Sequence, residues 1–143
     1  MSTFMDQIRN NQTDVAEEQS ATLAINALLK ASLMKTACVV ATTANIADLA
    51  TGLAAGATID GVTLAAGNRV LVKDQTDAKT NGIYVVTTTE PIRADDFDAG
   101  AEMSCAFVPV AKGTAGGMKL FQCTAVDITV GTTNITFAAR AFA

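Results

Sequence analysis

The sequence contains no histidine and no tryptophan among its 143 residues. Histidine is the side chain used most often as a general base, and it is a common zinc ligand. Without it, a Ser–His or Cys–His nucleophile pair cannot form within one chain. The single tyrosine and the missing tryptophan also weigh against a platform on which sugar rings could stack. These absences favour a protein that is not an enzyme.

Charged residues are few as well. They make up 17% of the chain, whereas about 25% is typical of soluble domains. Two interpretations fit: a neutral polar surface built on the 20 threonines, or a surface partly buried against partner subunits. The net charge is −4 and the ten lysines and arginines are scattered singly, so a phosphate-binding patch and nucleic-acid binding are not expected.

Long apolar runs are missing too. No stretch approaches the roughly 18 apolar residues of a membrane-spanning helix, so no membrane partner is expected. The opening residues MSTFMDQIRNNQTD lack the basic and apolar regions of a signal peptide. We therefore expect synthesis in a host cytoplasm without an export signal.

Cysteine is present in an odd number, as Cys38, Cys105 and Cys123. Without a signal peptide, this count indicates free, buried thiols. A disulfide between Cys105 and Cys123 is still conceivable, because both lie in apolar, strand-like runs.

Residues 14–36 have the pattern of one amphipathic helix. Thr13 or Asp14 offers an N-cap, and Glu17 and Glu18 lie in the first turn, where the helix dipole favours them. Apolar residues follow at three- and four-residue spacing. The helix could pack on its own domain or on a partner. We assign residues 1–37 to an arm and helix used for attachment or oligomerisation, and expect the interface to contain Ile25, Leu28, Leu29 and Leu33.

From residue 38 onward, short β-prone runs alternate with turns. Asp60-Gly61 stands between two such runs and predicts a type I′ hairpin turn. Residues 69–73 alternate, with Val70 and Val72 on one face. The other expected strands lie in residues 37–43, 83–89, 103–113 and 118–126, followed by a last hairpin that turns at residues 131–134. Residues 38–143 are thus predicted to be a mainly β domain, a small antiparallel sandwich or barrel of six to eight strands.

Two loops carry carboxylates. Asp95, Asp96 and Asp98 lie in one loop, and Asp74 and Asp77 in another. Hard oxygen ligands of this kind suit Ca²⁺, but the spacing does not match an EF-hand loop. We interpret these residues as turn caps and expect no metal and no other cofactor. If calcium were bound, Asp95, Asp96 and Asp98 would be its candidate ligands.

The glycine-rich stretch KGTAGG, residues 112–117, has the composition of a phosphate-binding loop. It lacks the Gly-Lys-Ser/Thr ending of such a loop and does not open a helix. We therefore expect a turn and no phosphate site.

The segment IDGVTLAAGNRVLVKDQTDAKTNGIYVV, residues 59–86, closely resembles a segment of many bacteriophage tail-fibre and related appendage proteins. The similarity continues through IRADDFDAGAEMSCAFVPVAKGT (residues 92–114) and LFQCTAVDITVGTTNITFAA (residues 120–139). It covers about residues 38–140 in order. One departure is Ile92, where that family often has tryptophan.

The resemblance implies a β scaffold in a virion, which depends on turns and strand register rather than on reactive groups. It implies a homotrimer that contacts other virion proteins. We expect a short stand-alone virion protein, a tail-fibre-like appendage or adaptor component. A capsid decoration or cement protein is the main alternative, and a host-glycan-binding module is another. Deleting residues 1–36 is expected to leave a folded domain that no longer enters particles.

Overall fold

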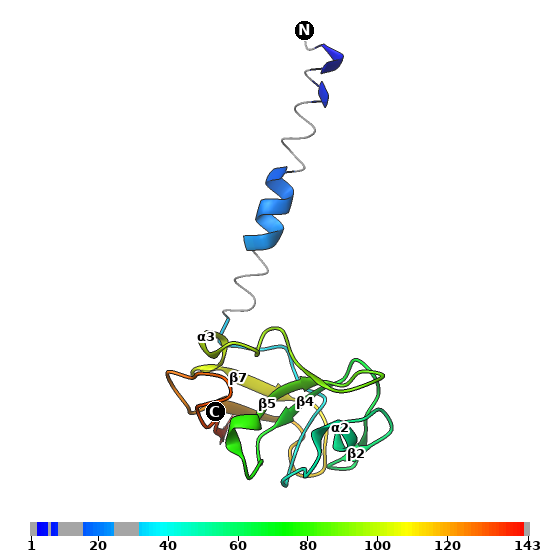
Figure 1. Ribbon diagram of the computed structural model, residues 1–143, viewed down its shortest axis with the longest axis vertical. Coiled ribbons are helices and arrows are strands. Elements are labelled where there is room, and N and C mark those ends of the chain that lie inside the picture. The colour runs from blue at the N-terminus through cyan, green and yellow to red at the C-terminus, as the bar shows by residue number, and fades with distance from the viewer. Residues whose placement is uncertain (1–2, 6, 9–15, 25–31, 142–143) are drawn as a thin grey trace.

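The computed structural model describes residues 3–5, 7–8, 16–24 and 32–141, and these residues form a mainly β domain behind an N-terminal helix (Figure 1). The nine strands are β1 (Val40–Ala41), β2 (Thr58–Ile59), β3 (Val62–Thr63), β4 (Arg69–Val72), β5 (Gly82–Val85), β6 (Ile92–Arg93), β7 (Phe107–Val110), β8 (Lys119–Cys123) and β9 (Phe137–Arg140). The short helical turns are α2 (Leu49–Gly52), η1 (Ala78–Thr80) and α3 (Gly100–Met103), and residues 16–24 form the N-terminal helix. The predicted fold class is confirmed, and the architecture is compatible with a β-sandwich.

Two sheets carry most of the fold. One has the order β1-β4-β5-β6, in which β1 runs parallel to β4 and the other neighbours are antiparallel. The other is antiparallel, with the order β7-β8-β9. The hairpin β2–β3 forms a separate two-stranded sheet.

Strands β4 and β5 are buried on both faces because their side chains alternate between two apolar clusters. Leu71 and Ile83 belong to the main core, which also takes in the buried side chains of β7 and β8. Val70, Val72 and Tyr84 point into a second cluster, which α2 and the β2–β3 hairpin cover with Leu49, Ile59 and Val62. The predicted alternation of residues 69–73 is confirmed.

The extended segment that leads into β1 connects the two sheets. Met34 and Cys38 form parallel bridges with Phe107 and Val110 of β7. Immediately afterwards, Val40 and Ala41 pair with β4. Pro109 lies in β7, the outer strand of its sheet, as predicted; this segment runs along the open side of β7.

The helix prediction is wrong at its C-terminal end. Residues 16–24 are helical, whereas the chain bends at Leu33 and is extended from Met34. The backbone N–H of Lys35 donates to the Phe107 carbonyl at 2.9 Å, and the Phe107 N–H donates to the Leu33 carbonyl at 2.7 Å. Pairing with β7 thus uses backbone groups that a helix would need. Residues 25–31, with the predicted interface residues Ile25, Leu28 and Leu29, lie outside the described residues.

The predicted last hairpin is also wrong in part. A turn does form, since the Thr132 and Thr133 N–H groups donate to the Thr129 carbonyl. Residues 128–130 form no strand, however, and β9 pairs with β8, for example through Phe121 and Ala139. Ile128 is instead inserted into the main core, which explains the apolar character of this run.

Candidate functional site

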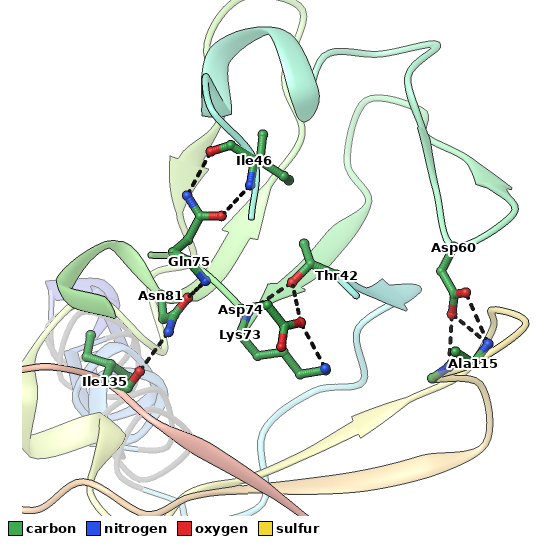
Figure 2. Close-up of polar contacts among 10 residues, drawn as sticks. Thr42, Ile46, Asp60, Lys73, Asp74, Gln75, Asn81, Ala115 and Ile135 are labelled. Carbon is green, nitrogen blue, oxygen red and sulfur yellow. Dashed lines mark hydrogen bonds and ion pairs between the residues drawn. The ribbon is translucent and has the colours of Figure 1, made fainter. Parts of the chain in front are cut away.

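Several polar side chains of residues 59–86 bind backbone groups of the same chain. Gln75 is the clearest example (Figure 2): the Ile46 N–H donates to its Oε1 at 2.7 Å, and its Nε2 donates to the Ile46 carbonyl at 3.0 Å. The side-chain amide pairs with Ile46 as a neighbouring strand would. It fixes the loop after β4 to the segment that precedes α2.

Asn81 makes a second connection of this kind. Its Oδ1 accepts from the Gln75 N–H at 3.0 Å, and its Nδ2 donates to the Ile135 carbonyl at 2.9 Å (Figure 2). Only 2% of Asn81 is exposed. One buried amide therefore joins the β4–β5 loop to the segment before β9.

A third group lies where β4 ends. The Lys73 N–H donates to the Thr42 hydroxyl oxygen at 3.0 Å, and that hydroxyl donates to Asp74 at 3.3 Å. The Lys73 ammonium also contacts the Asp74 carboxylate at 2.9 Å. Asp74 thus helps to connect the end of β4 to Thr42, the residue after β1. This is a structural role of the kind expected for a turn residue.

Asp60 uses both its backbone and its carboxylate. Its φ of 45° and the φ of 81° at Gly61 form the predicted type I′ turn between β2 and β3. The carboxylate accepts from the N–H groups of Ala115 at 3.0 Å and Gly116 at 2.9 Å (Figure 2). The glycine-rich stretch 112–117 is therefore a turn, as expected, but it encloses an anionic group of the same chain. The glycine content of residues 112–117 was a sequence signal for an anion-binding turn. The sequence did not show that the anion would be Asp60, which lies 55 residues from Ala115.

The acidic loop does not assemble a calcium site. Asp96 forms a two-point ion pair with Arg69, with both N–O distances at 3.0 Å. Asp95 and Asp98 are exposed. Within the parts of the chain that the structure describes, no group of three or more acidic or cysteine side chains is placed to hold a metal ion.

Lys35 is a buried cation that the sequence did not single out, and 3% of it is exposed. Burial lowers its pKa, while the negative charges of Asp96 and Glu102 act in the opposite direction. Its position beside the Arg69–Asp96 pair places a charged residue of the N-terminal segment inside the β domain.

The three cysteines are free. Cys38 and Cys123 are buried as expected, and burial raises the pKa of the Cys38 thiol to about 12. Cys105 is exposed, so the prediction of burial is wrong there. It precedes β7 in a turn with a φ of 63°, which places its side chain outside the sheet pattern.

One open cleft of about 480 Å³ lies between residues 45–50 and 75–80. The Gln75–Ile46 pair lies within its lining. Its carboxylates cap the turns on either side: Asp48 accepts from the Ala50 N–H at 3.0 Å, and Asp77 accepts from the Lys79 N–H at 3.4 Å. These contacts use the acidic groups of the cleft to hold loop structure.

Exposed large apolar side chains gather at the N-terminal end. Every residue of the helix 16–24 is exposed, and the helix lies outside the β domain in Figure 1. Of the eight exposed large apolar residues in the described part of the chain, five precede residue 35. They are Phe4, Met5, Leu23, Leu33 and Met34. Leu33 is the one predicted interface residue that the structure describes, and 54% of it is exposed.

Comparisons with protein-family models, with curated proteins and with solved structures each return no match. No helix in the described ranges is both long and apolar enough to cross a membrane.

Proposed function

We propose that the chain is a non-enzymatic structural protein of a bacteriophage virion, a homotrimeric tail-fibre-like appendage or adaptor component. The N-terminal segment attaches it to its neighbours and the β domain is displayed. The proposal rests first on the resemblance of residues 38–140 to appendage proteins, with the motifs in the same order.

The contacts of those motifs support a scaffold role. Gln75, Asn81 and Asp60 each bind backbone groups of a distant segment, and Arg69 pairs with Asp96. A catalytic or ligand-binding motif would keep its polar atoms directed at a substrate. Here they hold loops and strand register, which is what an assembly module needs.

The distribution of exposed apolar side chains is the observation that carries the attachment role. Phe4, Met5 and Leu23 are 75%, 64% and 70% exposed, and they lie on the N-terminal segment. Apolar surface of this kind is buried in stable protein–protein contacts. A chain with only 17% charged residues is suited to such contacts.

The test compares the full chain with a fragment of residues 32–143 in virions produced in infected cells. The fragment begins at residue 32, rather than at 37, because Met34 and Lys35 pair with β7. We expect the full chain to be present in purified particles and the fragment to be absent from them, although it folds. A fragment that enters particles at the level of the full chain contradicts the attachment role.

The number of copies per particle separates the two structural alternatives. Quantitative mass spectrometry against the major capsid protein measures it. An amount far below that of the capsid protein indicates a tail or collar component. A comparable amount indicates a capsid decoration protein. Absence of the chain from particles contradicts both.

A further inference from the structure

The polar contacts between the β2–β3 hairpin and the rest of the domain all involve one residue of the hairpin. Among the described residues, the hydrogen bonds that leave hairpin residues 58–63 all end on Asp60: the Thr114 N–H donates to its carbonyl, and Ala115 and Gly116 donate to its carboxylate. A two-stranded hairpin is marginally stable by itself in water. Apart from Asp60, the hairpin is held by the packing of Ile59 and Val62 on the second apolar cluster.

The turn that receives Asp60 is built for a carboxylate. Two successive N–H groups, from Ala115 and Gly116, converge on Oδ2 at 3.0 and 2.9 Å. Consecutive backbone N–H groups form a concave site for anions. A Cβ atom at Gly113, whose φ is 122°, would collide with the same Oδ2. The glycines thus give the turn its backbone conformation and leave room for the carboxylate.

The surrounding charges also favour the ionised form. The positive charges of Lys73, which follows β4, and of Lys119, at the start of β8, act on Asp60, and the receiving turn contributes no acidic residue. The N–H groups of Gly116 and Ala115 are the largest cause of a lowered pKa at Asp60, and the two lysines act in the same direction. The hydrogen bonds therefore stabilise the hairpin above the ordinary aspartate pKa of 3.8, and this contribution is lost as the pH falls through the lowered value.

We propose that Asp60 is an acid-sensitive latch: its carboxylate holds the β2–β3 hairpin on residues 114–116, and its protonation releases the hairpin and uncovers the apolar cluster beneath. Protonation removes the negative charge and turns one carboxyl oxygen into a donor, so the neutral acid is a weaker acceptor for the Ala115 and Gly116 N–H groups. The four-stranded sheet keeps its own pairing in the released state, because no strand of the hairpin belongs to it. Acid thus exposes apolar surface around Leu64 and Val72 while the sheet persists.

The test follows backbone amides by NMR in the full chain while the pH is lowered from neutral. We expect the Ala115 and Gly116 resonances to titrate together with a midpoint below 3.8, the ordinary aspartate value. We expect amide protection in residues 58–63 to fall with the same midpoint, and protection in β4 and β5 to persist. Simultaneous loss of protection in the hairpin and in β4–β5 overturns the latch, because it indicates global acid unfolding.

An Asp60→Asn variant separates the latch from protonation of other carboxyl groups. Asparagine tolerates positive φ, so the turn is kept while the negative charge is removed. At neutral pH the hairpin amides of this variant should have lost protection. Equal hairpin protection in the variant and the parent overturns the proposal. If the variant does not fold, the titration of the parent decides alone.

Asp48→Asn is the matched control. Asp48 also has a lowered pKa, from hydrogen bonds with Thr51 and Ala50, but both partners lie within its own turn. Its replacement removes a comparable carboxylate without separating distant segments. Hairpin protection at neutral pH should be unchanged, and a loss equal to that in Asp60→Asn contradicts the assignment of the latch to Asp60.

Discussion

Asn81 illustrates how single polar residues hold this low-charge domain together. Only 2% of Asn81 is exposed, yet its amide oxygen and nitrogen both have backbone partners. Burying an amide is favourable only when such partners are present. Because Gln75 and Ile135 belong to different loops, the loss of this one side chain would leave two backbone groups without partners.

We predict that Asn81→Ala lowers the free energy of unfolding by about 2–3 kcal/mol, since each polar group left buried and unpaired costs about 1–3 kcal/mol. Urea denaturation at neutral pH measures the change. Asn134→Ala is the control, because Asn134 is exposed in the turn after residue 131. It should change stability by no more than about 0.5 kcal/mol. Equal effects of the two substitutions would contradict the bridging role of Asn81.

At the residue scale, the sequence predicted local conformation better than distant partners. The Asp60-Gly61 turn was correct because its two positive φ angles depend on these residues alone. The partner of the Asp60 carboxylate lies 55 residues away and has no sequence signal of its own. Phe97 was not predicted to belong to the core, because it lies in an acidic loop and its partner is distant in the sequence. It is fully buried, and its ring centroid lies 6.0 Å from that of Phe137.

Among the elements, the segment 33–38 has the largest consequence for the boundary of the domain. Its apolar spacing continues that of the preceding helix, so Leu33 was predicted to be helical. The open side of β7 supplied competing backbone partners, and Lys35 is buried in the extended form. A helical period cannot reveal such competition, because it arises only when β7, more than 70 residues later in the chain, is in place.

We therefore predict that a fragment of residues 32–143 has the stability of the β domain in the full chain, whereas a fragment of residues 37–143 is less stable by about 2 kcal/mol. The shorter fragment lacks two backbone hydrogen bonds to Phe107, each worth about 1 kcal/mol, and also the buried Lys35. Thermal and urea unfolding of both fragments measure the difference. Equal stability would show that pairing with β7 does not contribute to the fold.

On the scale of the whole molecule, the two ends of the chain differ in how their apolar residues are used. In the β domain, two clusters bury them on both faces of the β4–β5 hairpin. In the N-terminal segment, side chains such as Phe4 and Leu23 have no such cover within the described chain. The proposed assembly assigns this segment to contacts between subunits and with neighbouring virion proteins, while the β domain folds independently of them.

This division of roles predicts a trimer that depends on the N-terminal segment. Sedimentation equilibrium should give a trimer for the full chain and a monomer for residues 32–143. Replacing Leu28 and Leu29 by Gln should weaken the trimer, because both belong to the predicted apolar stripe and each buried leucine contributes about 1.5–3 kcal/mol. Glutamine has nearly the helix propensity of leucine, so the substitutions change the predicted helical tendency of these residues little.

The control for the stripe is Gln19→Ala in the helix of residues 16–24. At 100° per residue, Gln19 would lie on the polar side, away from the predicted stripe of Ile25 and Leu28, and it is exposed. Its replacement should leave the trimer intact. Equal weakening by both changes would mean that the helix associates through a different face, and a monomeric full chain would mean that trimers require the particle.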